Sequence, residues 1–163
     1  MKKSIFGLAI LLMLIYVNVA KGEEMIAKGK TVKFDYTLTV EEKVVDSSLG
    51  KEPLEYVQGS NMIIPGLEKQ MEGLKVGDER TFTIKPEEAY GMIDQRMVVE
   101  IPKSKITTKD FAPEKGMVIQ MQTQNGPMPG MIQEVKADSL MVDFNHPLAG
   151  QTLTFKIKVI DIK

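Results

Sequence analysis

Apolar and polar positions alternate along several short stretches of the chain, which is the pattern of half-buried β-strands. The clearest are residues 30–39 (KTVKFDYTLT) and 151–163 (QTLTFKIKVIDIK), where apolar side chains occupy every second position. In the second stretch the alternation becomes irregular near Ile160 and Ile162. Shorter extended segments are predicted at residues 44–46, 54–57, 80–84, 97–101, 117–124, 131–135 and 140–144. The sequence therefore predicts a chain rich in β-structure.

One stretch follows helical spacing instead. Pro65 suits the first position of a helix, and apolar residues follow it at Leu67, Met71 and Leu74, spaced by four and three. Gly73 keeps the element short. Because a lone helix with one apolar stripe must cover something, the flanking strands are expected to offer it a sheet face. The predicted fold class is α+β, with an antiparallel sheet wrapped on one short helix.

The sequence after residue 93 has a different pattern of apolar runs and turn residues. Asn125-Gly126 lies between two apolar runs and is a strong hairpin signal, while Pro127 and Pro129 favour a sheet edge for the returning strand. The strands and helix predicted before residue 93 still lack one partner strand, and the last strand of the chain is expected to supply it. We therefore predict a small β-rich domain inserted into a discontinuous parent domain, with residues 94–146 as the insert and residues 23–93 plus 147–163 as the parent.

The first 22 residues are predicted to lie outside the fold. A basic tip, Met1-Lys2-Lys3, precedes an uncharged run from Ser4 to Ala20, and Ala20-Lys21-Gly22 has the small-x-small pattern of a signal-peptidase site. We interpret residues 1–22 as a cleaved secretory signal, with an uncleaved membrane anchor as the alternative. An exported, periplasmic protein is expected, with membrane contact only if the signal is retained.

Charge and composition narrow the classes of function. Without residues 1–22 the chain keeps 18 basic and 22 acidic side chains, a net charge of about −4, whereas nucleic-acid binding usually needs a basic face. Cysteine is absent and histidine occurs once, so no cofactor and no metal site is predicted. The single histidine, His146, lies in an Asn-His-Pro turn sequence and is interpreted as structural. A monomer that binds no nucleic acid is expected.

Several motifs agree in order and spacing with a known family. They are residues 45–48 (VDSS), 63–68 (IIPGLE), 71–78 (MEGLKVGD) and 88–91 (EAYG). Together they resemble FKBP-type peptidyl-prolyl cis-trans isomerases. Residues 145–153 (NHPLAGQTL) further resemble the SlyD-like branch, in which a chaperone domain is inserted in the flap of the isomerase domain. The resemblance covers nearly all of residues 27–163.

Carried over position by position, the resemblance implies catalytic roles for five residues: Tyr36, Asp46, Ile64, Tyr90 and Phe155. The hydroxyl of Tyr90 and the backbone N–H of Ile64 would bind substrate carbonyl groups, and Asp46 would fix Tyr36. Taken alone, Tyr36 and Phe155 would be core residues, and Asp46 would be a turn residue.

A second set of residues is implied to contact substrate: Val45, Leu54, Ile63, Leu67 and Met128. Ile63 and Leu67, with Phe155, would seat the proline ring. The best-known members of the family have Trp where this chain has Leu67, and Phe where it has Val45 and Leu54. A shallower, less aromatic pocket is therefore expected. Met128 lies in the insert, within Pro-Met-Pro, and is expected to be exposed to unfolded clients.

The chemistry that these residues imply needs no nucleophile. An apolar cup favours the twisted prolyl amide over the more polar planar form. The predicted function is peptidyl-prolyl isomerisation and chaperoning of exported proteins, with unfolded or partly folded clients that carry X-Pro bonds as partners. The alternative is a non-catalytic chaperone that binds clients on the same scaffold.

Overall fold

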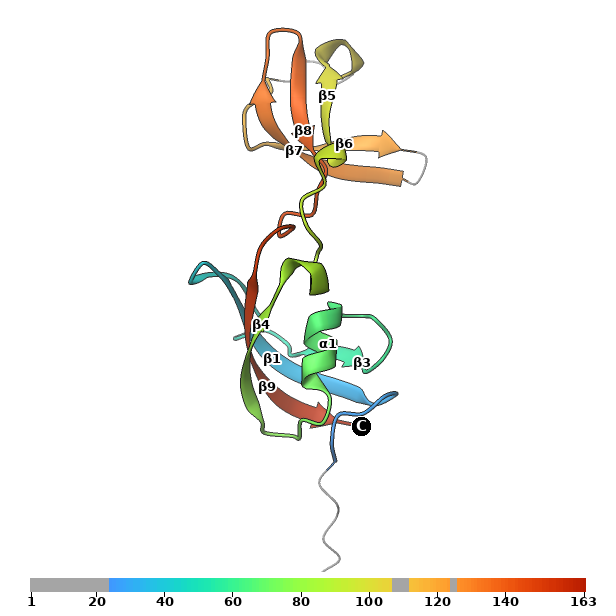
Figure 1. Cartoon of the computed structure of the whole chain (residues 1–163), viewed down its shortest axis with the longest axis vertical. Helices are drawn as coiled ribbons and strands as arrows, with labels where there is room; N and C mark the ends of the chain where they lie inside the picture. The colour runs from blue at the N-terminus through green and yellow to red at the C-terminus, as the bar shows by residue number, and fades with distance from the viewer. Residues whose placement is uncertain (1–23, 107–111, 124–125) are drawn as a thin grey trace, which may run out of the picture.

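The structure is a computed structural model that describes residues 24–106, 112–123 and 126–163. The molecule is elongated, with one sheet at each end and two lengths of chain between them (Figure 1). The predicted signal segment, residues 1–22, and Asn125 of the predicted hairpin turn lie outside the described residues.

The larger sheet has five antiparallel strands in the order β2-β1-β9-β4, and β3 pairs with β1 as well. They are β1 (Thr31–Val40), β2 (Lys43–Ser47), β3 (Leu54–Val57), β4 (Glu79–Ile84) and β9 (Leu153–Ile162). The last strand of the chain therefore lies between two strands from its first half (Figure 1). The α+β class and the return of the C-terminal strand agree with the sequence prediction.

The helix α1 (Pro65–Met71) packs on this sheet and buries Leu67 and Met71 in its core. It ends at Met71 because Glu72 has an extended backbone (φ −57°, ψ 134°) and Gly73 has φ 81°, a value that favours glycine. Leu74, which we predicted to lie on the helical stripe, is thus outside the helix. It still packs against the same core.

A β-bulge explains the irregular alternation at the end of the chain. The register pairs Val32 with Ile162 but Phe34 with Val159, so β9 has one extra residue between them. Ile160 is exposed, whereas Val159 and Ile162 are both buried. The bulge therefore returns Ile162 to the core face, which a regular period of two would not do.

The smaller sheet has four antiparallel strands in the order β5-β8-β7-β6. They are β5 (Val98–Pro102), β6 (Val118–Thr123), β7 (Gly126–Val135) and β8 (Ser139–Asp143). Ile101, Ile132, Leu140 and Val142 form a hydrophobic cluster of their own on this sheet. Short 3₁₀ turns occur at η1 (Pro86–Glu88), η2 (Gln95–Met97) and η3 (Lys103–Lys105). The division into a parent domain and an inserted domain at residues 94–146 stays a prediction.

The sequence led us to predict that Pro127 and Pro129 place their strand at a sheet edge, but β7 is not an edge strand. β7 lies inside the sheet, between β6 and β8. Pro127 and Pro129 lie in the half that pairs with β6, and the pairing with β8 begins only at Met131. In this half, β7 has a hydrogen-bonded neighbour on one side only. Proline lacks an N–H, so it is tolerated where the missing donor would point to the side without a neighbouring strand.

Gly66 gives a test of how closely α1 packs. A Cβ at this position would lie 2.5 Å from Cγ2 of Ile84 and 2.9 Å from Cβ of Glu88. We predict that Gly66→Ala lowers the free energy of unfolding by about 1–3 kcal/mol, the usual cost of overpacking. Lys69→Ala, at an exposed position of the same helix, should change it by less than about 0.5 kcal/mol. Urea denaturation of both variants measures this, and equal stability would contradict the packing.

Candidate active site

A cavity of about 430 Å³ opens between the larger sheet and α1. Side chains from β1, β2, β3, β9, α1 and two loops surround it. Its lining consists of Phe34, Tyr36, Leu38, Asp46, Leu54, Asn61, Met62, Ile63, Ile64, Leu67, Ala89, Tyr90 and Phe155. We call this space the main cavity.

The inner part of the main cavity is apolar. Leu67 of α1 and Phe155 of β9 are buried, at 2% and 7% exposure, and both belong to the core cluster. The ring of Tyr36 lies beside Phe155, with a centroid separation of 6.1 Å and an interplanar angle of 47°. Since successive side chains of a strand point to opposite faces, the cavity residues of β1, which are Phe34, Tyr36 and Leu38, lie at every second position.

One strong polar contact lies at the rim. The Tyr36 hydroxyl donates a hydrogen bond of 2.6 Å to Oδ2 of Asp46, and the backbone N–H of Ser47 donates to Oδ1 of the same carboxylate. The hydrogen bond to Asp46 raises the pKa of Tyr36 to about 12. The same bond lowers the pKa of Asp46. The pair therefore stays a protonated phenol and an ionised carboxylate at neutral pH.

The loop from β3 to α1 forms another side of the rim. It contributes Asn61, Met62, Ile63 and Ile64 to the lining. The carbonyl of Ile64 accepts the first helical hydrogen bonds of α1, whereas no hydrogen bond from the Ile64 N–H is formed among the residues that the structure describes. That N–H, at the start of a helix, is available as a donor to a ligand.

Buried polar groups hold this loop against the helix. Oε1 of Glu68 accepts a 2.8 Å hydrogen bond from the Gly59 N–H, and the side-chain amide of Gln58 donates to the Glu68 carbonyl at 3.0 Å. The hydroxyl of Tyr56 donates to Oε1 of Gln58 at 2.7 Å, and burial raises the pKa of Tyr56. Because each buried polar group has a partner, the loop is well positioned to line the main cavity.

Tyr90 lies in the irregular segment that follows η1. Its side chain is 39% exposed and lines the main cavity next to Ala89. The ring of Tyr90 stacks on that of His146, with centroids 3.7 Å apart and planes within 6° of parallel. The rim of the cavity thus includes a ring supported by a residue 56 positions later in the chain.

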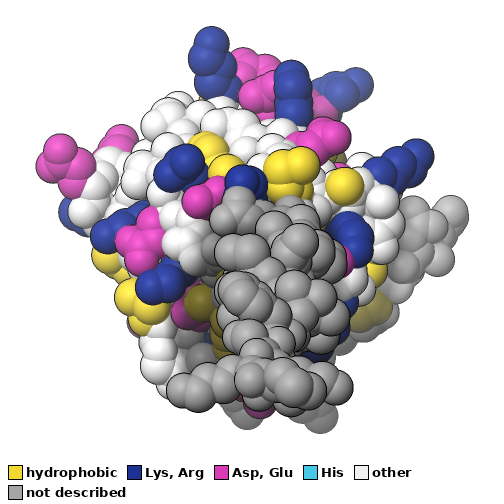
Figure 2. All heavy atoms as spheres, turned by 90° about the horizontal axis from the view of Figure 1, so that it is seen from below, with side chains coloured by type: hydrophobic (Ala, Val, Ile, Leu, Met, Phe, Trp, Pro, Cys, Tyr) yellow, Lys and Arg dark blue, Asp and Glu magenta, His cyan; other side chains and the backbone are white. Residues whose placement is uncertain are grey.

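On the face shown in Figure 2, Lys and Arg side chains are interspersed with Asp and Glu. Within the described residues there is no cluster of three or more His, Cys, Asp or Glu side chains that would hold a metal ion. None of the described helices has the length and apolarity needed to cross a membrane.

Comparison with known proteins identifies the family. The sequence profile of the FKBP-type peptidyl-prolyl cis-trans isomerases matches residues 22–160. The chain belongs to this family. It is 39% identical over 153 residues to a short-type peptidyl-prolyl cis-trans isomerase of Methanocaldococcus jannaschii, covering 85% of this chain and 95% of that protein. It is 41% identical over 139 residues to the isomerase SlyD of Vibrio cholerae, covering 85% and 69%.

A third relative, a probable FKBP-type 16 kDa isomerase of Pseudomonas fluorescens, is 36% identical over 142 residues and covers 86% of this chain and 94% of that protein. The resemblance inferred from the motifs is therefore confirmed. The chain is a SlyD-like, FKBP-type peptidyl-prolyl cis-trans isomerase.

The main cavity gathers most of the residues predicted for the isomerase site. They are Tyr36, Asp46, Leu54, Ile63, Ile64, Leu67, Tyr90 and Phe155. The expected contact between Tyr36 and Asp46 is also present. The roles assigned to these residues in binding and catalysis stay predictions.

Val45 is not part of the cavity lining. Its side chain is 47% exposed. The register pairs Leu38 with Asp46 and Thr39 with Val44, so Val45 is the extra residue of an irregularity between them. Asp46 faces the cavity, and its chain neighbour is left facing solvent. The sequence motif identifies Val45 and Asp46 as neighbours of the site, but it cannot reveal the bulge that turns Val45 away from the cavity.

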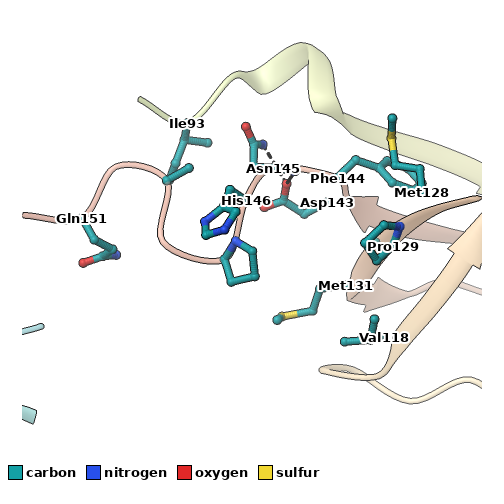
Figure 3. A pocket seen from close by; sticks show the side chains of 13 residues that line it. Ile93, Val118, Met128, Pro129, Met131, Asp143, Phe144, Asn145, His146 and Gln151 are labelled. Carbon is teal, nitrogen blue, oxygen red and sulfur yellow. Dashed lines mark hydrogen bonds between the residues drawn. The ribbon is translucent and has the colours of Figure 1, made fainter. Parts of the chain in front are cut away.

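Met128 was expected to be exposed, but it is half-buried. It lines a second space of about 440 Å³, which we call the junction hollow, where the smaller sheet meets the two connecting lengths of chain (Figure 3). Met131 and Val118, which form a cross-strand pair, line the same hollow and are 42% and 65% exposed. The remaining lining comes from Ile93, Pro129, Gly130, Asp143, Phe144, Asn145, His146, Pro147, Ala149 and Gln151.

Five residues of the main cavity were not predicted from the sequence. They are Phe34, Leu38, Asn61, Met62 and Ala89. For Phe34 and Leu38 the signal was available, because they alternate with Tyr36 on one strand and share its face. The positive φ of Asn61, 58°, and the resulting course of its loop have no comparable signal in the sequence.

The Tyr36–Asp46 hydrogen bond leads to a testable prediction. Asp46→Asn replaces an ionised acceptor by a neutral amide, so the pKa of Tyr36 should fall from about 12 toward the ordinary tyrosine value of about 10. NMR titration of the tyrosine ring carbons measures it. Asp35→Asn is a matched control, because the Asp35 carboxylate accepts from Ser48 instead. An unchanged pKa of Tyr36 in Asp46→Asn would show that the bond does not form in solution.

Proposed function

We propose that the main cavity binds the proline ring and the preceding amide of an X-Pro segment, and that the chain also acts as a chaperone for exported proteins. The observation that carries the isomerase site is the arrangement of the cavity itself. An apolar interior formed by Leu67 and Phe155 lies beneath a rim that holds a free N–H and two tyrosines. The pattern combines burial for the proline with donors for its neighbouring carbonyl groups.

The proposed mechanism works through burial. Rotation about a prolyl amide crosses a barrier of roughly 20 kcal/mol because it breaks the C–N resonance. The planar amide has the larger charge separation, so transfer into an apolar cavity raises its free energy more than that of the twisted form. Each ~1.4 kcal/mol of this difference speeds rotation about tenfold. No bond to carbon is made or broken.

The individual residues have distinct parts in this proposal. Ile63, Leu67 and Phe155 seat the proline ring. The Tyr90 hydroxyl and the Ile64 N–H donate to substrate carbonyl groups and hold the amide as it twists. Asp46 holds the Tyr36 hydroxyl in place through their 2.6 Å hydrogen bond.

The chaperone activity is assigned to the smaller sheet. Val118 and Met131 of this sheet are exposed apolar side chains that line the junction hollow, and Ile93 of the connecting chain lies beside them in the same lining. Exposed apolar surface of this kind suits a protein-binding site. Met128 and Met131 add flexible thioethers, which adapt to varied partners. Unfolded segments with X-Pro bonds are the clients we propose. In this arrangement residues 94–146 act as an inserted chaperone domain.

Export is proposed from residues 1–22, whose basic tip, uncharged run and small-x-small end have the form of a secretory signal. The chaperone would then act on proteins outside the cytoplasm. N-terminal sequencing of the protein recovered from expressing cells tests this. A mature N-terminus at or near Glu23 supports the proposal, and an intact N-terminus in the membrane fraction favours an anchor.

Tyr90→Phe tests the proposed role of the hydroxyl. It removes one hydrogen bond to a substrate carbonyl and keeps the ring, so kcat/KM for a proline-containing tetrapeptide should fall about two- to tenfold. Ser139→Ala is the control for loss of a hydroxyl hydrogen bond, because the Ser139 hydroxyl donates to Glu100 within the smaller sheet and Ser139 lines neither space. It should leave kcat/KM of the folded protein unchanged. Full activity of Tyr90→Phe would remove Tyr90 from the assignment.

The double variant Val118→Ser/Met131→Ser tests the chaperone site and separates it from the isomerase site. It removes exposed apolar area from the junction hollow, so suppression of aggregation of an unfolded protein should weaken several-fold. Turnover of the tetrapeptide should not change. Val44→Ser is the control, because Val44 is 63% exposed on β2 and lines neither space.

Equal aggregation suppression by the double variant and the wild type would place client binding elsewhere. The same pair of assays addresses the alternative of a client-binding protein without catalysis, which predicts suppression of aggregation but no turnover of the tetrapeptide.

A further inference from the structure

The main cavity and the junction hollow share a wall made of two stacked rings. Tyr90 lines the first space and His146 lines the second. Their centroid separation of 3.7 Å and nearly parallel planes bring the two rings into face-to-face van der Waals contact. Neither ring can turn about its χ angles without losing this contact, so their orientations are linked.

His146 is the more firmly held of the two rings. Its Nδ1 accepts a 3.1 Å hydrogen bond from the Leu148 N–H, and its backbone carbonyl accepts one from Ala149 at 2.8 Å. Since Nδ1 is an acceptor, the imidazole proton of the neutral ring is on Nε2. The turn predicted at Asn-His-Pro is formed, and the histidine side chain accepts one of the hydrogen bonds of this turn.

The two connecting lengths of chain are tied together at two places next to the stack. At the first, the Gly150 N–H donates to the carbonyl of Gly91, the chain neighbour of Tyr90, at 2.8 Å. At the second, the side chain of Asn145, the chain neighbour of His146, bonds the Asp94 backbone twice, accepting from its N–H at 2.9 Å and donating to its carbonyl at 3.0 Å. The backbones that carry Tyr90 and His146 are therefore held in a fixed relation.

Tyr90 itself has less support. It follows η1 in a segment without regular structure, next to a glycine with φ 79°, and more than a third of its side chain is exposed. A partly exposed tyrosine on such a segment samples several rotamers unless a neighbour excludes them. The face of the His146 ring is that neighbour.

We propose that His146 is a positioning residue for the isomerase: by stacking, it fixes the Tyr90 ring in the orientation that presents its hydroxyl to the main cavity. The inference rests on the proposed role of Tyr90 and extends it to a residue contributed by the segment that leaves the smaller sheet. His146 acts through Tyr90 and does not touch the substrate.

Two substitutions separate stacking from the turn. His146→Phe keeps an aromatic face against Tyr90 and loses the Nδ1 acceptor. His146→Asn loses the ring and keeps an acceptor, because an asparagine oxygen also bonds the N–H two residues later. We expect kcat/KM for a proline-containing tetrapeptide to fall about two- to tenfold in His146→Asn, the factor that corresponds to one aromatic pair. In His146→Phe it should stay near the wild-type value.

NMR gives a readout that a purely structural role would not change. In the wild-type protein the ring protons of Tyr90, assigned with Tyr90→Phe, should be shifted upfield by the facing imidazole. The shift should persist with a phenyl ring at position 146 and vanish in His146→Asn, whose thermal stability is measured in parallel. If His146→Asn does not fold, the wild-type shift and the activity of His146→Phe still decide the matter.

The results that overturn the proposal are specific. Wild-type activity in His146→Asn would mean that the ring at this position does not matter. A loss of activity in His146→Phe would mean that the Nδ1 hydrogen bond of the turn matters and that stacking does not suffice. Absence of the upfield shift in the wild type would show that the stack is not formed in solution. A fully active Tyr90→Phe would instead remove the hydroxyl role on which the proposal rests, while leaving the NMR evidence for the stack intact.

Discussion

The pairing of β9 with both β1 and β4 is the interaction on which the site depends. Phe155 of β9 lies opposite Leu38 on one side and Phe82 on the other, and it also forms part of the cavity interior. Without β9 the sheet would be split and the main cavity would lose one wall. The chain reaches this position only after building a second sheet of four strands.

That long excursion costs little because its two ends are held together. The entropy of closing a loop grows only slowly with its length. The Asn145–Asp94 and Gly150–Gly91 hydrogen bonds return the chain close to where it departed. The same contacts bring His146 against Tyr90. The segment that allows the excursion thus also completes the rim of the proposed isomerase site.

The strands and the helix could be predicted because burial follows a local period, as the alternation of β1 and β9 shows. The family motifs added most of the cavity residues, since Asp46 or Tyr90 alone has no distinctive spacing. Bulges were beyond such reasoning: one leaves Val45 exposed, and another returns Ile162 to the core. The contact between Tyr90 and His146 was also invisible, because no sequence period relates residues so far apart. It follows from how the two connecting segments are tied together.

The chemistry of the cavity fits a reaction that breaks no covalent bond. Among the described residues that line it, the ionisable side chains are Asp46 and two tyrosines, and Asp46 is already bonded to Tyr36. With the pKa of Tyr36 raised to about 12, neither member of that pair is suited to exchange protons at neutral pH. Burial and carbonyl donors are the source of the rate enhancement that we propose.

The central claim is that rotation of the amide is catalysed without proton transfer, and a solvent deuterium isotope effect tests it most directly. We predict that kcat/KM for a proline-containing tetrapeptide, measured in H2O and D2O at matched pH near neutrality, gives a ratio close to one. A ratio of about two or more would show a proton in motion in the rate-limiting step and would contradict the account.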